Sequence, residues 1–481
     1  MKHADCLYSQ SENHCTLRCL AGIGTWNLEP GTWNLEHKSL SHMSEMKDLL
    51  ITNVRPVDEQ RDGSETVDIL IRGGIIADIG QGSDGSGQKK PGHPDSAGDV
   101  PVFDAEVAYV SPGWMDMHVH LREPGFEHKE TVRTGCAAAA NGGFTAVACM
   151  PNTNPPIHTR DVVSYVLKQA QGLPVDVYPI GTVSKDRAGK SISEMADMKE
   201  GGAVAFSDDG DPVQNSLLMR TALEYAAMLD VPVINHEEDL PLSRPGHMHE
   251  GRVSTRLGLA GTPSIAEEIM IARDILLSEL TGGHVHVAHI STRKGVELVR
   301  EAKSKGLKVT TEVCPHHFDL TDEEIERQQF HTNWKMHPPL RTADDMEAMI
   351  EGLKDGTIDA ICTDHAPHSV DEKEVEFIYA PNGIIGLETA WSIICKRLLS
   401  GGILSLQDVI RKLSVHPRNI LRIPVPKLEV GEPANITIFD TETEWICTPE
   451  SIRSRSVNTP WLNETLRGRA IAVYNNNQFV G

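Results

Sequence analysis

The alternation of short apolar runs with longer helical segments constrains the fold of this chain most. The apolar runs are Phe144–Met150, Val175–Ile180, Val231–Asn235, Val285–Ile290, Val309–Val313 and Ala360–Thr363. Buried strands that alternate with helices favour an α/β fold with a parallel sheet. A doubly wound sheet would show similar runs, but the number of units and the polar residues that follow them favour a closed TIM (β/α)8 barrel over residues 113–425.

Both ends of the chain predict a second, smaller domain made of strands. Strand-like runs in residues 46–112 are Leu49–Val54, Val67–Ile71, Ile75–Ile79 and Val107–Val110, and those in residues 426–481 are Ala434–Asp440 and Ala470–Tyr474. We expect the two ends to form one β-sandwich. Residues 80–99 are rich in Gly, Ser, Asp, Lys and Pro and predict a mobile insertion.

Residues 1–45 differ from the rest of the chain. They are polar, lack sustained periodicity and contain Gly24–Glu29 again as Gly31–Glu36. Two copies are too few for a repeat fold. Met46 stands immediately before the first strand-like run, so we interpret residues 1–45 as a disordered or non-native leader.

Charge and composition exclude several classes of protein. The 481 residues carry 45 basic and 68 acidic side chains, a formal net charge of −23, which argues against a nucleic acid or an anionic membrane as the main partner. No run approaches the roughly 20 apolar residues of a membrane span, and the N-terminus lacks the pattern of a signal peptide. The nine cysteines form no CxxC pair, which favours reduced thiols. We therefore expect a cytoplasmic protein.

His118 and His120 follow a short strand-like run, two residues apart. Residues two apart share one face of a strand, so the two imidazoles would point the same way. Zinc accepts such nitrogen ligands. Taken alone the pair is weak, since packed or surface histidines are more common.

Three further residues strengthen the metal hypothesis. His236, His289 and Asp364 each follow a separate strand-like run, where the loops of a barrel carry its active site. Four histidines and a carboxylate exceed the needs of one tetrahedral zinc ion, which predicts two ions and a bridging ligand. Asp209 is the preferred bridge over Asp208, although an Asp pair before glycine is also typical of a turn.

Arg122 and Asn152 are candidate substrate ligands. Arg122 lies two residues after His120, and Asn152 follows the next strand-like run. A guanidinium at this rim could bind a substrate carboxylate through two hydrogen bonds.

Together these segments resemble the dihydroorotases of the amidohydrolase superfamily. The matching motifs are His118–Gly125, Met150–Thr153, Asp208–Gly210, Cys314–His317 and Thr363–His368, and the resemblance covers residues 46–481. Allantoinases and hydantoinases share the HxH motif but do not use the arginine that stands here at Arg122.

The resemblance implies the role of each matching residue. It assigns two zinc ions per subunit to His118, His120, Asp209, His236, His289 and Asp364, with Asp209 touching both. It assigns substrate contacts to His120, Arg122, Asn152, His337, His368, Asn382 and Gly383, and the catalytic acid/base role to Asp364. The implied reaction is the reversible, zinc-dependent conversion of (S)-dihydroorotate and N-carbamoyl-L-aspartate in de novo pyrimidine biosynthesis.

The chain departs from the family pattern at two places. Many members of the superfamily bridge their metals with a carboxylated lysine, but no lysine lies between Lys199 and Gly210. The chain therefore resembles the dihydroorotases that use aspartate, and an aspartate bridge need not hold both ions equally. His337 stands where relatives commonly place asparagine. Residues 369–385 are either a mobile lid or a static loop.

Two alternative functions remain open at this point. One is a related cyclic amidohydrolase of the allantoinase or hydantoinase type, which Arg122 disfavours. The other is a non-catalytic dihydroorotase-like partner of aspartate transcarbamoylase, which the complete set of ligand positions disfavours. The resemblance also implies a homodimer and a possible association with aspartate transcarbamoylase.

Overall fold

The computed structural model describes residues 46–81 and 100–481. The expected leader, residues 1–45, lies outside the described residues, and so does the expected insertion from residue 82 to residue 99.

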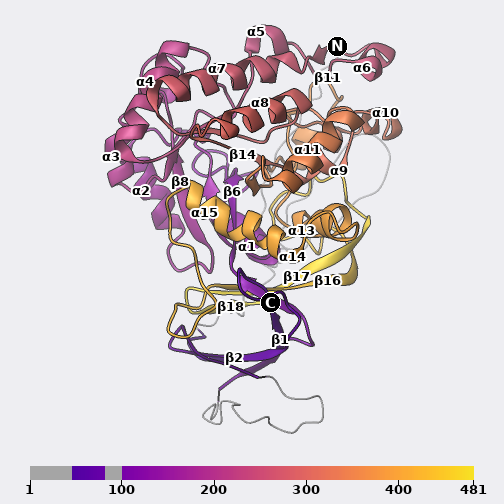
Figure 1. Cartoon of the computed structure of the whole chain (residues 1–481). Helices are drawn as coiled ribbons and strands as arrows, with labels where there is room; N and C mark the ends of the chain where they lie inside the picture. The colour runs from indigo at the N-terminus through magenta and orange to yellow at the C-terminus, as the bar shows by residue number, and fades with distance from the viewer. Residues whose placement is uncertain (1–45, 82–99) are drawn as a thin grey trace, which may run out of the picture. The chain divides into compact units, whose positions relative to one another are not determined.

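Eight parallel strands form the barrel (Figure 1). In spatial order they are β6 (Trp114–Val119), β7 (Phe144–Cys149), β8 (Asp176–Gly181), β9 (Ala205–Phe206), β10 (Val233–Asn235), β13 (Val285–Val287), β14 (Val309–Val313) and β15 (Ala360–Ile361). A parallel bridge between Val119 and His365 joins the first strand to the segment after the last. The barrel is thereby closed, which confirms the predicted fold class.

Helices connect successive strands around the barrel (Figure 1). The longer ones are α1 (Val132–Asn141), α2 (Arg160–Gln169), α4 (Ser216–Leu229), α7 (Ile265–Thr281), α8 (Arg293–Ser304) and α11 (Ala343–Asp355). The shorter ones are α3 (Met195–Glu200), α5 (Leu240–Ser243), α6 (Arg252–Leu257), α9 (Pro315–Asp319), α10 (Glu324–Arg327), α12 (Val370–Lys373), α13 (Ala390–Ile394), α14 (Leu406–Ile410) and α15 (His416–Ile420). None of the helices among the described residues is both long and apolar enough to cross a membrane.

The side chains of the barrel strands divide between two apolar clusters. Ala146 and Ala148 of β7 belong to the cluster inside the barrel, whereas Val147 and Cys149 pack against the surrounding helices. Successive side chains of a strand point to opposite faces, so a continuously apolar strand can serve both layers. The barrel interior is therefore filled with side chains, and its carboxyl-terminal mouth remains for the site.

Both chain ends form one eight-stranded mixed sheet. Its order is β18 (Gln478–Val480), β17 (Thr465–Asn475), β16 (Ile436–Ile446), β5 (Tyr109–Pro112), β1 (Leu49–Pro56), β2 (Val67–Arg72) and β3 (Ile75–Gln81), and β4 (Val102–Asp104) pairs with β1. Ile51 and Ile69 from the N-terminal part pack with Ile438 and Tyr474 from the C-terminal part in one buried cluster. The predicted contribution of both chain ends to one β unit is confirmed, and that unit is a single mixed sheet.

Some strands are shorter than the apolar runs predicted. The run Val107–Val110 becomes a strand only at Tyr109, because Val107 has a φ of 71°. The run Val285–Ile290 ends as a strand at Val287, before His289, which has a φ of 30°. Positive φ values are incompatible with an extended strand, so the strands begin or end beside these residues.

Candidate active site

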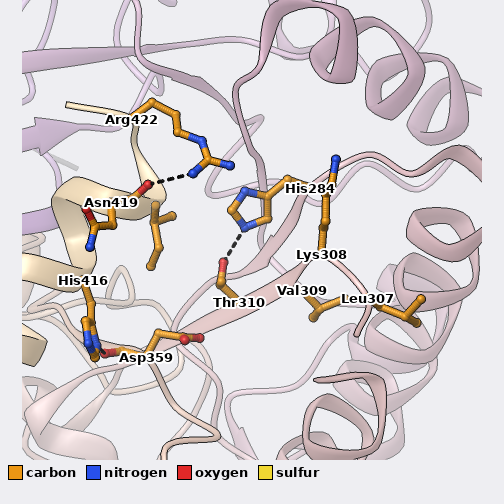
Figure 2. A pocket seen from close by; sticks show the side chains of 10 residues that line it. His284, Leu307, Lys308, Val309, Thr310, Asp359, His416, Asn419 and Arg422 are labelled. Atoms are coloured by element: carbon orange, nitrogen blue, oxygen red, sulfur yellow. Dashed lines mark hydrogen bonds between the residues drawn. The ribbon is translucent and has the colours of Figure 1, made fainter. Parts of the chain in front are cut away.

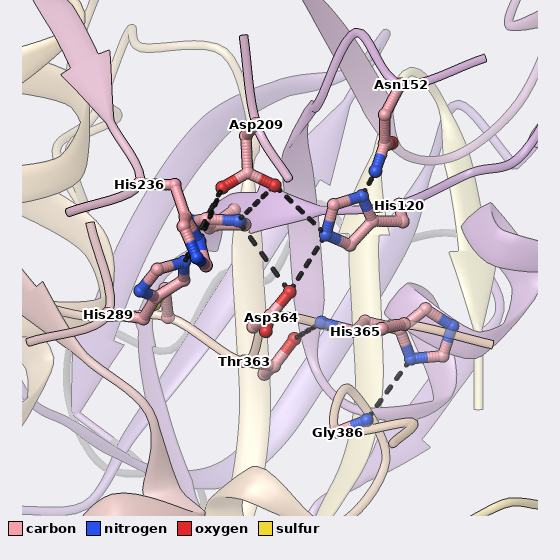
Figure 3. A network of polar contacts seen from close by, with 12 residues as sticks. His120, Asn152, Asp209, His236, His289, Thr363, Asp364, His365 and Gly386 are labelled. Carbon is pink, nitrogen blue, oxygen red and sulfur yellow. Dashed lines mark hydrogen bonds and ion pairs between the residues drawn. The ribbon is translucent and has the colours of Figure 1, made fainter. Parts of the chain in front are cut away.

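The six candidate metal ligands meet at the carboxyl-terminal mouth of the barrel, and all of them except His118 are labelled in Figure 3. His118 lies at the end of β6 and His120 just beyond it, and the others follow later strands: Asp209 after β9, His236 after β10, His289 after β13 and Asp364 after β15. All six side chains are buried. The closed barrel thus brings together residues that are up to 246 positions apart in the sequence.

Asp209 lies between two pairs of histidines. Its Oδ2 atom is 3.6 Å from Nε2 of His118 and 3.6 Å from Nε2 of His120. Its Oδ1 atom is 3.6 Å from Nδ1 of His236 and 3.5 Å from Nε2 of His289. Each pair, together with Asp209, places its ligand atoms within 4.8 Å of one another, which suits a metal ion. One carboxylate therefore serves two adjacent groups of potential ligands.

Asp364 faces the group that contains His118 and His120. Its Oδ1 atom lies 2.9 Å from Nε2 of His120 and 3.7 Å from Nε2 of His118 (Figure 3). Asp364 has a φ of 47°, a left-handed conformation that is uncommon for residues other than glycine. Such strained residues concentrate at functional sites, because the surrounding structure must hold them in place.

The electrostatics of the cluster favour a bound cation. Burial opposes a charge on His118, yet the carboxylates of Asp209 and Glu312 raise the pKa of this imidazole well above its ordinary value. Burial also opposes a charge on His236, but Asp209 and Glu238 raise the pKa of this imidazole to about 10. Nε2 of His118 and Oδ1 of Asp209 are buried without a hydrogen-bond partner. Buried polar atoms without partners are costly, and metal ions in the two ligand groups would satisfy them.

Two of the four histidines have a hydrogen-bond partner on the ring nitrogen that faces away from Asp209, and a third has a carboxylate nearby. Nδ1 of His118 lies 2.6 Å from Oε1 of Glu312, and Nδ1 of His120 lies 2.8 Å from Oδ1 of Asn152. Nε2 of His236 lies 3.6 Å from Oε2 of Glu238. Partners of this kind fix the orientation and tautomer of metal-binding imidazoles.

Sequence reasoning missed the roles of Glu312 and Glu238. For Glu312 the sequence did contain a signal, because an acidic residue inside the apolar run Val309–Val313 would be buried and would need a polar partner. Asn152 was expected to contact substrate, and the structure places it beside His120. Asp208, the rejected bridge, accepts hydrogen bonds from the backbone N–H groups of Val183 and Ser184 and so anchors a neighbouring loop.

The substrate candidates lie around the same mouth. Nε of Arg122 donates to the carbonyl oxygen of Pro367 at 3.1 Å, and Nη2 lies 3.4 Å from Nε2 of His368. Nε2 of His368 lies 2.8 Å from the carbonyl oxygen of Asn382. His368 therefore lies between the guanidinium of Arg122 and the backbone of Asn382.

His337 reaches the other group of ligands. Its Nε2 atom lies 2.9 Å from Oε2 of Glu238, and its ring stacks on that of His236 with centroids 4.8 Å apart. The side chain of His337 is 26% exposed, so it lies at the boundary between the metal ligands and the open mouth.

Comparison with known proteins agrees with this geometry. Residues 108–295 match the family described as "Dihydro-orotase-like". The dihydroorotase of Syntrophus aciditrophicus is 48% identical over 84% of this chain and 96% of its own length. That of Pelotomaculum thermopropionicum is 50% identical over 83% and 95%, respectively.

Solved structures share the fold at lower identity. The L-hydantoinase (dihydropyrimidinase) of Arthrobacter aurescens aligns with a TM-score of 0.77 at 26% identity, over 91% of this chain and 96% of that one. The dihydropyrimidinase of Brevibacillus agri aligns with a TM-score of 0.75 at 22% identity, over 90% and 95%. The fold and the buried ligand groups agree with the sequence similarity to dihydroorotases, which is 48–50% identity over more than four fifths of the chain. The chain belongs to the dihydroorotase family of cyclic amidohydrolases.

Proposed function

We propose that this chain interconverts dihydroorotate and N-carbamoyl-L-aspartate, and that in the cell it closes the ring for pyrimidine biosynthesis. The observation that carries the proposal is Asp209 between two pairs of buried histidines, with Arg122 at the same mouth. The hydrolase domain would span residues 113–425, flanked by the domain that residues 46–112 and 426–481 build.

Two zinc ions fit the ligand groups of this site. His118, His120 and Asp364 would hold one ion, His236 and His289 the other, and Asp209 would contact both in place of a carboxylated lysine. When bound, the ions would supply an activated water at neutral pH and polarise the carbonyl of the ring amide.

The chain's own residues would bind the substrate and move the proton. Arg122 would hold the substrate carboxylate with two hydrogen bonds, and His120, Asn152 and His337 would line the ring. His368 with Asn382 and Gly383 would cover it.

Asp364 would accept the proton of the attacking water at a carboxylate oxygen and pass it to the departing ring nitrogen. In the ring-forming direction the same carboxylate would take the proton from the carbamoyl nitrogen. Its position 2.9 Å from His120 supports this role, because it places the acid/base within the ligand cluster.

The remaining expectations rest on the family resemblance. They are a cytoplasmic homodimer and an association with aspartate transcarbamoylase.

The decisive experiment is to follow ring opening of dihydroorotate by ultraviolet absorbance with the zinc-loaded protein. We expect activity in the wild type and its loss by a factor of about 10²–10⁴ in Asp364→Asn, the range for a general acid/base. Allantoin and hydantoin serve as competing substrates. A wild type that hydrolyses either of them but not dihydroorotate would refute the proposal.

A further inference from the structure

A line of polar side chains crosses the barrel interior behind His118. Glu312 and Thr310 lie two residues apart on β14, and His286 lies on β13 two residues after His284. Because strand side chains alternate, they share the inward direction of Ala288 and Cys314, which belong to the interior cluster. This position is unusual for polar groups, since burying them is costly without partners.

Hydrogen-bonding distances make up this line except between Glu312 and His286, where the contact is longer and neither facing atom has a hydrogen-bond partner. Nδ1 of His118 lies 2.6 Å from Oε1 of Glu312, whose Oε2 lies 3.5 Å from Nε2 of His286. The hydroxyl of Thr310 lies 2.8 Å from Nδ1 of His286 and 2.8 Å from Nε2 of His284. His118, Glu312 and His286 are fully buried.

Only one arrangement of protons satisfies all of these contacts with neutral imidazoles. If Nε2–H of His284 donates to Thr310, the Thr310 hydroxyl donates to Nδ1 of His286, whose Nε2–H then faces Glu312. The opposite arrangement would direct the lone pair of His286 Nε2 at the Glu312 carboxylate, which is repulsive. Glu312 therefore accepts a hydrogen bond from Nδ1–H of His118 and faces Nε2–H of His286 across a longer electrostatic contact of 3.5 Å.

The far end of the line opens at the amino-terminal mouth of the barrel. His284 and Thr310 line a cavity of about 330 Å³ together with Asp359, His416 and Arg422 (Figure 2). His284, Lys308 and Asp359 immediately precede β13, β14 and β15. The cavity therefore lies at the end of the barrel opposite to the metal ligands. His284 is thus anchored at a polar opening, whereas the links between it and His118 are enclosed by the barrel.

We propose that Glu312, His286 and Thr310 are positioning residues, which hold His118 as the tautomer with Nδ1 protonated and Nε2 free for a metal ion. This inference rests on the proposed zinc site. Nε2 of His118 points toward Asp209 and Asp364, so only this tautomer presents a lone pair to the ligand group that they share. When an ion takes the place of the proton at Nε2, the line from β13 and β14 would keep the remaining proton on Nδ1.

The test measures zinc affinity by competition with a chromophoric chelator, and not activity alone. We expect Glu312→Gln to weaken the binding of one of the two zinc ions by about 10- to 100-fold. This is the range for residues that hydrogen-bond to a metal-binding histidine. Thr310→Val should weaken the same ion by about fivefold, which corresponds to one net hydrogen bond. Thr310→Ser keeps the hydroxyl and should bind zinc like the wild type.

A second readout and a matched control separate positioning from folding. In the cobalt-substituted protein, Glu312→Gln should shift the visible absorption bands, because the donor strength of His118 changes. Glu388→Gln also removes a buried carboxylate, but one that accepts hydrogen bonds from Asn141 and the backbone of Arg453 and Ser454. It should leave zinc affinity and the cobalt spectrum unchanged.

The outcomes distinguish this inference from the proposed function. If the wild type binds two zinc ions but Glu312→Gln and Thr310→Val bind them as tightly, the positioning role is wrong and the proposed function stands. If Thr310→Ser is as impaired as Thr310→Val, the hydroxyl link is wrong. A wild type that binds no zinc overturns both.

Discussion

Nη2 of Arg122 lies 3.4 Å from Nε2 of His368 at the mouth of the barrel. Burial, then Arg122 and two lysines, lower the pKa of His368 to about 2, so this imidazole is neutral at physiological pH. Burial also lowers the pKa of Arg122, but only to about 10, and the guanidinium stays charged. Arg122 therefore carries a positive charge at this rim, near the two lysines, where a substrate carboxylate would bind.

Replacing Arg122 should impair substrate binding and spare the metals. We expect Arg122→Ala to raise KM for dihydroorotate by roughly 100-fold, because two charge-assisted hydrogen bonds are lost. Arg122→Lys keeps the charge but not the two-pronged geometry of the guanidinium. Its KM should therefore lie between those of the wild type and Arg122→Ala. Zinc content, measured by elemental analysis, should equal that of the wild type in both variants. Loss of zinc from Arg122→Ala would contradict the assigned role.

Asp209 and His236 should differ in how many metal ions depend on them. Asp209→Ala removes the carboxylate between both pairs of histidines, so we expect both zinc ions to be lost on dialysis. His236→Ala removes a ligand of one group only and should leave one ion bound. Elemental analysis gives the zinc-to-protein ratio of each variant. Equal ratios in the two variants would argue against a shared aspartate.

His337 should be replaceable by the asparagine that relatives carry. The asparagine amide can still donate to Glu238 and to a substrate, so His337→Asn should keep kcat/KM within about fivefold of the wild type. His337→Ala loses these contacts and should lower kcat/KM further, chiefly through KM. Steady-state kinetics on dihydroorotate provide the comparison, and a loss as large in His337→Asn as in His337→Ala would show that the amide does not replace the imidazole.

Glu388 should make stability depend on pH. Burial, opposed by hydrogen bonds from Arg453, Asn141 and Ser454, raises the pKa of Glu388 from an ordinary 4.5 to about 7. The folded protein thus binds this proton more tightly than the unfolded chain. Its contribution to stability is complete below about pH 4.5 and is lost as the pH rises through about 7.

The variant Glu388→Gln isolates this effect. Between about pH 4.5 and 7, the free energy of unfolding of the zinc-free wild type should fall relative to that of Glu388→Gln. Denaturant unfolding at several pH values measures both, and parallel curves over this interval would show that Glu388 is ionised to the same extent in the folded and unfolded chain.

The sequence by itself determined the architecture and the types of ligand. The alternation of apolar runs with helical segments is a property of the sequence alone. A strand that is apolar on both faces must be buried on both faces, and a parallel barrel covered by helices provides this burial. The HxH pair and the polar residues after the later runs fall at strand ends by sequence position alone. A closed barrel places the ends of its strands at one mouth, so these residues were expected to lie close together. The structure brings them together.

Only the tertiary structure decided the details of the site. The left-handed conformations of Arg122, His289 and Asp364, with φ values of 63°, 30° and 47°, depend on neighbours that hold them in place. The pairing of Glu312 with His118 joins residues 194 positions apart, and Glu238 joins His236 to His337. Local sequence encodes periodicity, but the hydrogen-bond partner of a buried polar group depends on which strands become neighbours.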